Sequence, residues 1–248
     1  GVETLNLTNK STNAGVVDLA GVDATSATGF VTVNVAGTGA TTLNALNTDI
    51  NVVNASAATG SLTLAAGQRD ADAMTVTGGY GVDAIAMENV ADVMDGGAGV
   101  DALSINFAAI LGGLSVDLSS TTDQITAMDG GSNAAVQKNF EDVDASSFSG
   151  FGAVMKGSSA ANHFIGTVKT DNISGGAGND VVGLESTMFT GATVDTVDGG
   201  TGTDHFAIIG GSTIANSADF GARIVPTASN MDTTTIVAYG PSASVLSF

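Results

Sequence analysis

Aspartate recurs at a fixed interval in one part of this sequence. Asp83, Asp92 and Asp101 stand nine residues apart, and an apolar residue follows two places after each of them. This interval fits neither the period of an α-helix, about 3.6 residues, nor a simple hairpin. Carboxylate oxygens are the ligands that hard divalent cations such as Ca²⁺ prefer. The spacing therefore raises the question of how the chain brings these oxygens together.

Eight units of nine residues share this register. Their sixth residues are Asp83, Asp92, Asp101, Asn162, Asp171, Asp180, Asp195 and Asp204. Their eighth residues are all apolar, namely Ile85, Met94, Leu103, Phe164, Ile173, Val182, Val197 and Phe206. Glycine is frequent at the head of a unit and permits tight turns, while polar and apolar residues alternate at the tail. Each unit is therefore predicted to be a turn followed by a three-residue strand.

Strands this short are not stable alone, so successive units must coil and pair each strand with the strand one full coil away. Coiling also stacks the aspartates of alternate units at about 4.8 Å, where carboxylates repel each other. In a chain with no cysteine and only six Lys+Arg, a cation with oxygen ligands relieves that repulsion. The predicted fold is all-β: an elongated parallel β-helix or β-roll with calcium-binding glycine-rich turns.

The units resemble the nonapeptide GGxGxDxUx of the repeats-in-toxin (RTX) family, a Ca²⁺-binding β-helix repeat. Four units match in full: GGYGVDAIA, GGAGVDALS, GGAGNDVVG and GGTGTDHFA. MENVADVMD, GTVKTDNIS and TGATVDTVD lack the glycine pair, and GSSAANHFI carries Asn162 in place of the aspartate. These departures concern the metal occupancy of the affected turns rather than the coil.

The resemblance implies where several Ca²⁺ ions bind. In the family, one ion lies between turns two units apart, held by turn carbonyls and by the aspartate of each turn. The better site implied here comprises Gly79, Gly81 and Asp83 with Gly96, Ala98 and Asp101. A second site comprises Gly176, Gly178 and Asp180 with Gly199, Thr201 and Asp204, and it requires the surplus residues Leu184 to Phe189 to loop out. Asp92, Asp171 and Asp195 are the remaining predicted metal ligands.

A second repeat, V-[DN]-A-[ST]-x-x-[ST]-G, occurs at Val22–Gly29, Val53–Gly60 and Val143–Gly150. A short strand-like segment follows each copy, which predicts further coils without metal turns. We expect one continuous domain with five parts. These are a calcium-poor β-helix stretch (1–77), a first RTX nonapeptide block (78–106), a connecting β stretch (107–156), a second RTX block (157–207) and a C-terminal β tail (208–248). A single helical turn within residues 107–118 is the alternative for that segment.

Composition disfavours several classes of function. The formal net charge of -19 makes nucleic acid an unfavourable partner. The absence of cysteine excludes disulfides and thiolate metal sites. No apolar run approaches the roughly 18 to 20 residues that a membrane helix needs, so we expect no membrane insertion.

The sequence contains no recognisable catalytic constellation, and we expect that the chain is not an enzyme. His163 and His205 are its only histidines and stand at seventh places of nonapeptides, so the zinc-protease motif HExxH is absent. The nucleophile motif G-x-S-x-G is absent as well. Both histidines are predicted to be solvent-facing strand residues.

Other carboxylates stand outside the sixth places. The pair Glu141 and Asp142 lacks the aromatic or basic neighbours that would shape a substrate cleft, and we interpret it as a solvated surface. Asp95 and Asp198 directly precede glycine pairs. They either add to a calcium shell or cap the turn.

The acidic, cysteine-free repeats, rich in Thr, Ala, Gly and Val, resemble RTX-type surface-layer (S-layer) proteins more closely than toxin tails. The resemblance implies a secreted structural protein, exported unfolded by type I secretion. Extracellular Ca²⁺ then folds it and assembles copies of it into a lattice on the cell surface, with contact to cell-surface polysaccharide through a missing region. Two alternatives are the C-terminal calcium-binding tail of a type I-secreted enzyme and an RTX adhesin segment. The first residues lack a start methionine, so we expect a piece of a longer chain; the last, VAYGPSASVLSF, fit an export signal or a final strand.

Overall fold

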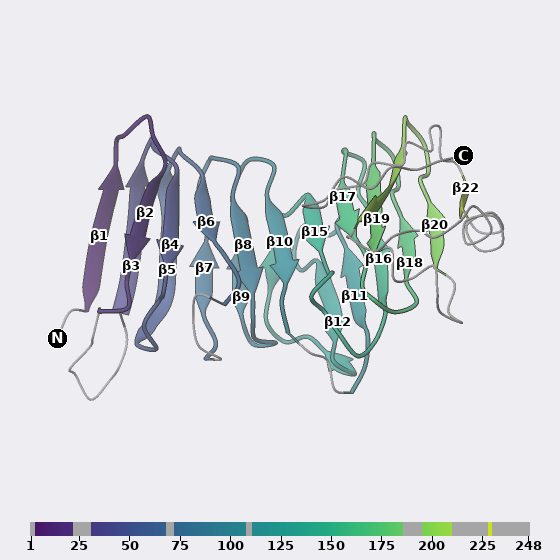
Figure 1. Cartoon of the computed structure of the whole chain (residues 1–248), viewed down its shortest axis with the longest axis horizontal. Helices are drawn as coiled ribbons and strands as arrows, with labels where there is room; N and C mark the ends of the chain where they lie inside the picture. The colour runs from purple at the N-terminus through teal and green to yellow at the C-terminus, as the bar shows by residue number, and fades with distance from the viewer. Residues whose placement is uncertain are drawn as a thin grey trace. The chain divides into compact units, whose positions relative to one another are not determined.

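The computed structural model describes residues 3–21, 31–67, 72–107, 111–185, 195–209 and 228–229. Every regular element in these ranges is a β-strand, and the strands pair mostly in parallel between successive coils (Figure 1). The described ranges form no helix, and so none that would cross a membrane. The predicted all-β, parallel β-helix architecture is confirmed. Most of the C-terminal tail and the whole first copy of the second repeat lie outside the described residues.

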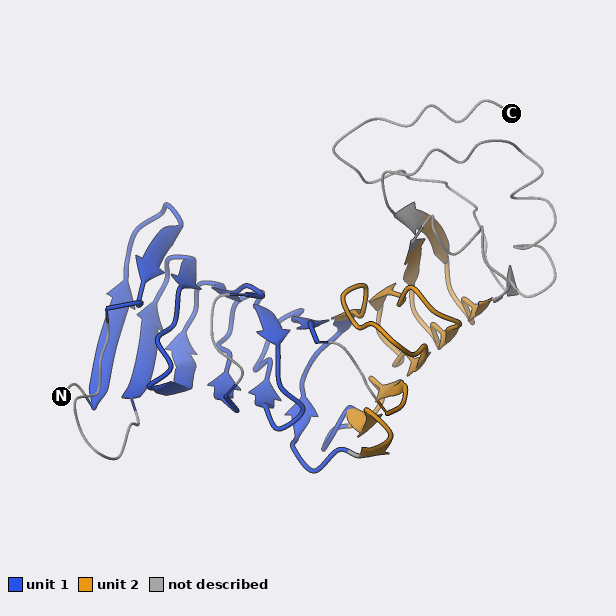
Figure 2. Ribbon diagram, turned by 60° about the horizontal axis from the view of Figure 1, so that its bottom comes forward, with its two compact units in different colours: residues 1–107, 121–124, 133–142 blue, residues 108–120, 125–132, 143–248 orange. Residues whose placement is uncertain are grey.

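The chain divides into two compact units (Figure 2). Unit 1 comprises residues 1–107, 121–124 and 133–142, and unit 2 comprises residues 108–120, 125–132 and 143–248. Unit 1 contains the first nonapeptide block and unit 2 contains the second. The short strand β15 (Asp142–Asp144) contains the last division point.

Unit 1 contains two runs of parallel strands. One run has the order β1 (Thr4–Asn9), β3 (Val31–Gly37), β5 (Ile50–Ala58), β7 (Thr75–Thr77), β9 (Val93–Asp95) and β14 (Gln137–Lys138). The other has the order β2 (Gly15–Asp18), β4 (Thr41–Asn44), β6 (Leu62–Leu64), β8 (Ala84–Met87) and β10 (Ala102–Ile105). Alternate side chains of a strand point inward, as at β3, where Val31 and Val33 are buried and Thr32 between them is partly exposed.

Unit 2 also contains two runs. One has the order β13 (Gly131–Ser132), β12 (Ile125–Met128), β11 (Leu114–Asp117), β16 (Ala153–Lys156), β18 (Asn172–Ser174), β20 (Thr196–Asp198) and β22 (Ala228–Ser229). The other has the order β17 (His163–Ile165), β19 (Val181–Glu185) and β21 (His205–Ile209). The pairs β11–β12 and β12–β13 are antiparallel, and the other pairs are parallel. Strand β11 occupies residues 114–117, and no helical turn is present in the other described residues of 107–118; residues 108–110 lie outside the described residues.

Strand pairing follows the predicted coil. In unit 1, Ile85 of β8 is opposite Leu103 of β10, which confirms pairing between alternate nonapeptides. In unit 2, Val182 of β19 is opposite Phe206 of β21. Hydrogen-bonded sixth residues are 18 residues apart in the first case and 24 in the second. The coil therefore keeps its register across the six surplus residues of the second block, although Leu184 and Glu185 extend β19 and do not loop out as expected.

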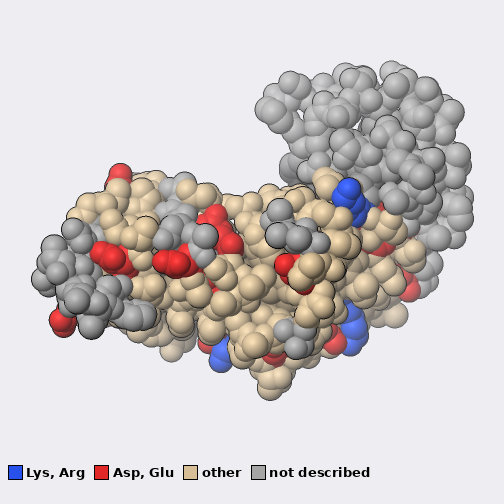
Figure 3. Space-filling view, turned by 90° about the horizontal axis from the view of Figure 1, so that it is seen from below, with Lys and Arg blue, Asp and Glu red and all other residues tan. Residues whose placement is uncertain are grey.

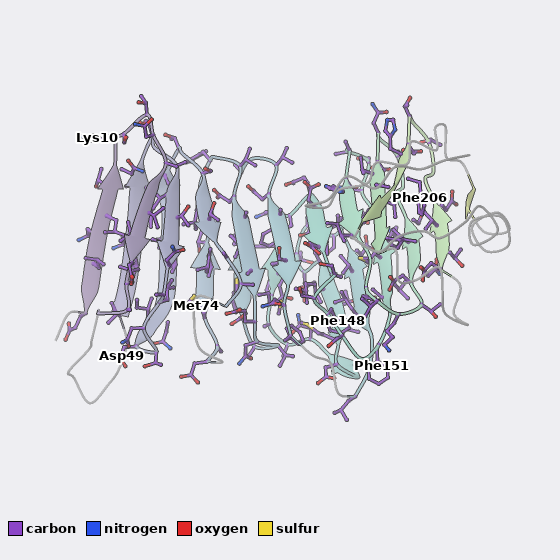
Figure 4. The ribbon with its side chains drawn as sticks, in the orientation of Figure 1. Lys10, Asp49, Met74, Phe148, Phe151 and Phe206 are labelled. Carbon is purple, nitrogen blue, oxygen red and sulfur yellow. The ribbon has the colours of Figure 1, made fainter. Side chains whose placement is uncertain are left out.

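The apolar eighth residues form the interior of both nonapeptide blocks, as predicted. None of them is more than 3% exposed. Phe206, labelled in Figure 4, is the eighth residue of the last nonapeptide and is 3% exposed. Outside the nonapeptides, Phe148 is fully buried in unit 2, whereas Phe151 is 39% exposed.

The two described copies of the second repeat share one local hydrogen bond. Asn54 Oδ1 accepts a hydrogen bond from the Ser56 N–H at 3.1 Å, and Asp144 Oδ1 accepts one from the Ser146 N–H at 2.9 Å. The flanking Val and Ala point inward, with both Ala55 and its counterpart in the other copy fully buried. The repeat therefore encodes an inward pair around an Asx residue, which ends the strand at Asp144 but lies within β5 at Asn54.

Candidate metal centre

The nonapeptide aspartates are not part of the acidic surface. Figure 3 shows acidic side chains spread over one face of the molecule, with few basic side chains among them. The sixth-position aspartates Asp83, Asp92, Asp101, Asp180 and Asp204 are 0% exposed, Asp171 is 1% exposed, and Asp195 is partly exposed. Burying an ionised carboxylate is costly unless hydrogen bonds or a cation compensate it. Their partners therefore decide what these turns can do.

One oxygen of each carboxylate joins consecutive coils. The Asp83 N–H donates to Asp101 Oδ1 at 2.7 Å, and the Asp180 N–H donates to Asp204 Oδ1 at 2.8 Å. The Asp171 N–H donates to Asp195 Oδ1 in the same way, also at 2.8 Å. Aspartate at the sixth place thus stabilises the coil by itself, because its short side chain reaches the backbone of the coil before it.

The other side-chain oxygen divides the turns into two classes. We call a turn closed when the N–H of its second residue donates to the side chain of its sixth residue. The donor–acceptor pairs are Gly79 N–H to Asp83 Oδ2 (2.6 Å), Glu88 N–H to Asp92 Oδ2 (3.0 Å), Ser158 N–H to Asn162 Oδ1 (2.7 Å) and Thr167 N–H to Asp171 Oδ2 (2.7 Å). The closed turns are 78–83, 87–92, 157–162 and 166–171. In these turns the hydrogen bonds satisfy the three carboxylates and the Asn162 amide oxygen without metal.

Three turns in the described ranges are open: 96–101, 175–180 and 199–204. Oδ2 of Asp101, of Asp180 and of Asp204 is buried and has no hydrogen-bond partner among the described residues. In each open turn the second glycine has a left-handed backbone, with φ of 96° at Gly97, 99° at Gly176 and 91° at Gly200. Only glycine adopts this conformation without strain. It turns the second N–H away from the carboxylate, so that one oxygen is left for another ligand.

The aspartate that precedes two of these glycine pairs takes up that N–H. The Gly97 N–H donates to Asp95 Oδ1 at 3.1 Å, and the Gly200 N–H donates to Asp198 Oδ1 at 3.2 Å. Asp95 also pairs with Lys138 Nζ at 3.2 Å. Of the two interpretations offered for these aspartates, the hydrogen bonds favour the cap.

The first glycine of a unit leaves room for oxygen atoms. A Cβ on Gly175 would overlap both Asp180 Oδ2 and the Gly199 carbonyl oxygen. Two oxygens from consecutive turns therefore converge on the space beside Gly175. An all-oxygen set of this kind suits Ca²⁺.

Some of the predicted carbonyl ligands already accept one backbone hydrogen bond. Gly79 O accepts from the Ala98 N–H at 2.8 Å, Gly176 O from the Thr201 N–H at 3.0 Å, and Thr201 O from the Gly178 N–H at 2.9 Å. A carbonyl oxygen has two lone pairs, so each keeps one for a cation. Within the described ranges, no three His, Asp or Glu side chains converge as a metal-binding group, so such carbonyls would have to complete the shell.

The two predicted sites differ in how many buried carboxylate oxygens lack a hydrogen-bond partner among the described residues. In unit 2, the structure stacks Asp180 against Asp204, and both turns are open. In unit 1, Asp83 and Asp101 stack in the same way, but the Asp83 turn is closed. The unit 2 pair therefore fits a cation better, although the sequence favoured the unit 1 pair. Asp92 and Asp171 lie in closed turns.

Burial raises the pKa of sixth-position aspartates in both classes of turn, including Asp171 in a closed turn. Burial, joined by the negative charges of Asp83, Glu141 and Asp95, raises the pKa of Asp101 to about 7 against the opposing hydrogen bond from the Asp83 backbone. Burial and then the Asp204 charge raise the pKa of Asp180. A raised pKa means that the ionised form is poorly stabilised by the protein alone. A bound cation would remove that deficit.

Sequence reasoning missed one carboxylate of this stack. Glu141 Oε2 accepts a hydrogen bond from the Asp101 N–H at 2.8 Å, so it is more than the solvated surface group that we expected. No nonapeptide marks it. Its one signal is that it directly precedes the strand β15, just as each sixth-position aspartate precedes its own strand.

Comparisons of this chain with models of protein families, with curated proteins and with solved structures find no match. The RTX resemblance therefore rests on the nonapeptides themselves.

Proposed function

We propose that this chain is a calcium-dependent structural segment of a secreted bacterial surface-layer protein of the RTX type. The observation that carries the proposal is the set of open turns, in which Asp101, Asp180 and Asp204 each keep a buried oxygen without a partner. A buried unsatisfied polar atom costs about 1 to 3 kcal/mol, more when charged. Ca²⁺ bound between stacked turns converts this cost into a link between coils.

The residues of unit 2 are the first candidates to hold an ion. Asp180 Oδ2 and the Gly199 carbonyl face the same space beside Gly175, and Asp204 in the next turn keeps a second buried oxygen without a partner among the described residues. Bound Ca²⁺ supplies positive charge and electrostatic cross-linking. The chain contributes the acidic oxygens, excludes water around them, and sets their spacing through the strand pairing of β19 with β21.

Moderate affinity is what this role requires. Extracellular calcium modules bind at about 10⁻⁴ to 10⁻³ M, so the chain would remain unfolded at low cytosolic calcium and fold after export. The stack of coils then presents a regular surface to copies of the same protein, and a further region would hold cell-surface polysaccharide. A role as an enzyme tail or as an adhesin would use the same calcium sites.

Calcium titration followed by circular dichroism tests the calcium part of the proposal. We expect the β signal to grow with calcium and to fall again with excess EGTA. By mass action, ligand at 100 times its Kd stabilises a fold by about 2.7 kcal/mol per site. A protein that keeps the same β signal and the same Tm in EGTA would contradict the proposal.

Electron microscopy tests the structural part. We expect purified protein to form two-dimensional arrays when calcium is added and to release them on chelation. A calcium-bound chain that stays monomeric would count against the lattice and favour the enzyme-tail alternative.

A further inference from the structure

The segment 138–141, Lys-Asn-Phe-Glu, stacks on the open turn 96–101 of unit 1 although it contains no nonapeptide. The Gly96 N–H donates to Lys138 O at 3.0 Å, as the Gly78 N–H donates to Asp95 O at 2.7 Å one coil earlier. A Cβ on Gly96 would overlap the Asn139 carbonyl oxygen, just as one on Gly78 would overlap the Gly96 carbonyl oxygen. Asn139 therefore takes the place of the first residue of a turn.

Glu141 takes the place of the sixth residue. Its Oε2 accepts from the Asp101 N–H at 2.8 Å, which repeats the bond of 2.7 Å between the Asp83 N–H and Asp101 Oδ1. Only Phe140 lies between Asn139 and Glu141, where a nonapeptide turn has four residues. The extra methylene of glutamate compensates for the shorter turn.

A buried amide holds this short turn in place. Gln124 Nε2 donates to Phe140 O at 2.9 Å, and the Phe140 N–H donates to Gln124 Oε1 at 2.9 Å. Gln124 is 4% exposed and Phe140 is 1% exposed. The two hydrogen bonds replace the backbone contacts that a neighbouring turn would otherwise provide.

We propose that Asp101 and Glu141, with the Asn139 carbonyl, form a Ca²⁺ site outside the nonapeptide pattern. The inference rests on the proposed calcium function. Asp101 is 0% exposed, and its Oδ2 has no partner among the described residues. Both carboxylate oxygens of Asp83, on one side of Asp101, already accept from the Leu62 and Gly79 N–H groups, so we assign the shared ion to Glu141 on the other side. The site ends the first calcium stack with a glutamate in place of another repeat.

Isothermal titration with Ca²⁺ tests the site in three variants of the full chain. Glu141→Gln keeps an oxygen for the Asp101 N–H but loses the charge. We expect this variant to bind one Ca²⁺ fewer, or to bind that ion with at least tenfold lower affinity. Asp142→Asn removes the same charge one residue away and should leave binding unchanged. The variant that combines Asp180→Asn with Asp204→Asn should no longer bind Ca²⁺ in unit 2 but should still bind the ion that depends on Glu141.

The outcomes separate this inference from the proposed function. If the unaltered chain binds no Ca²⁺ at 10 mM, both fail. If the Asp180/Asp204 variant loses binding but Glu141→Gln behaves as Asp142→Asn does, only the Glu141 site is overturned. A crystal structure of the unaltered chain grown with Ca²⁺ gives a test that does not depend on variant folding. Anomalous density between Asp101 and Glu141 supports the site, and its absence beside an ion at Asp180 overturns it.

Discussion

The turns 87–92 and 96–101 are consecutive in unit 1 and place a fully buried aspartate at the same position of the nonapeptide. In the first, the Glu88 and Asn89 N–H groups donate to Asp92 Oδ2 at 3.0 and 2.9 Å. In the second, Asp101 Oδ2 receives no such bond. The comparison separates two roles of one residue type. Aspartate at this place serves the coil in both turns, and it becomes a candidate metal ligand only where the backbone withholds its N–H groups.

A glycine pair is not sufficient to open a turn. The turn 78–83 matches the nonapeptide in full, yet Gly79 donates to Asp83 and lacks the left-handed backbone. This turn stacks on the coil of β5, where the Tyr80 N–H donates to Ala58 O at 2.9 Å. The residue before the pair is Thr77 rather than aspartate, but Ser174 precedes the open turn 175–180, so a missing aspartate does not by itself close a turn. The first turn of a stack is therefore closed by the coil beneath it.

The largest expected difference between the two classes concerns calcium itself. Asp180→Asn with Asp204→Asn removes two open carboxylates, and we expect the calcium midpoint for folding, followed by circular dichroism, to rise at least tenfold. Asp92→Asn changes a closed turn and puts an amide NH₂ where two N–H groups donate. It should destabilise the fold by about 1 to 3 kcal/mol while leaving calcium binding intact.

Thermal unfolding in EGTA and in calcium separates the two effects. The difference in Tm between these conditions should shrink in the double variant and persist in Asp92→Asn. Equal shrinkage in both would mean that open and closed turns bind calcium alike, and the distinction would be wrong.

The sequence predicted the coil because its signals are local and repeated. Each sixth aspartate is followed by a strand with an inward eighth residue, so register, strand positions and core followed from one column of apolar residues. The metal-binding state did not follow, because it depends on what lies one coil away. The nonapeptide of Asp83 matches the repeat in full, yet its turn is closed where it stacks on the neighbouring coil. Glu141 looks unremarkable and reaches Asp101 across 40 residues of sequence, through a turn too short to resemble the repeat.

A smaller effect is expected from the cap that precedes an open turn. Asp198→Ala removes the acceptor of the Gly200 N–H, which is then available to close the turn on Asp204. One hydrogen bond contributes about 1 kcal/mol, so the calcium affinity in unit 2 should fall about fivefold although Asp198 is not a proposed ligand. Titration calorimetry measures this change.

The matched control is Asp144→Ala, which removes a similar cap, Asp144 Oδ1 to the Ser146 N–H, and the same charge. It lies outside the glycine turns, so calcium affinity should be unchanged. An equal loss in both variants would assign the effect to net charge rather than to the turn.

The smallest effect is expected where a carboxylate of unit 2 is paired at the surface instead of buried in a turn. Lys156 Nζ lies 3.1 Å from Asp117 Oδ2, and the two side chains are 58% and 38% exposed. Burial acts to raise the pKa of Asp117, but hydrogen bonds from Ser119 and Lys156 outweigh it, and the pKa falls below its ordinary value of 3.8. The pair therefore stabilises the fold above that value, and the contribution is lost as the pH falls through the lower folded pKa.

Lys156→Met should accordingly cost less than about 1 kcal/mol near neutral pH, because exposed ion pairs are screened by solvent. The cost should vanish below the folded pKa of Asp117, where the carboxyl is protonated in both states. Urea unfolding at several pH values measures both quantities. The calcium midpoint should not move, since this carboxylate is satisfied by its own partners and has no buried oxygen to offer. A shift in the calcium midpoint as large as that of the Asp180/Asp204 variant would show that calcium affinity depends on total charge. The distinction between open and closed turns would then be wrong.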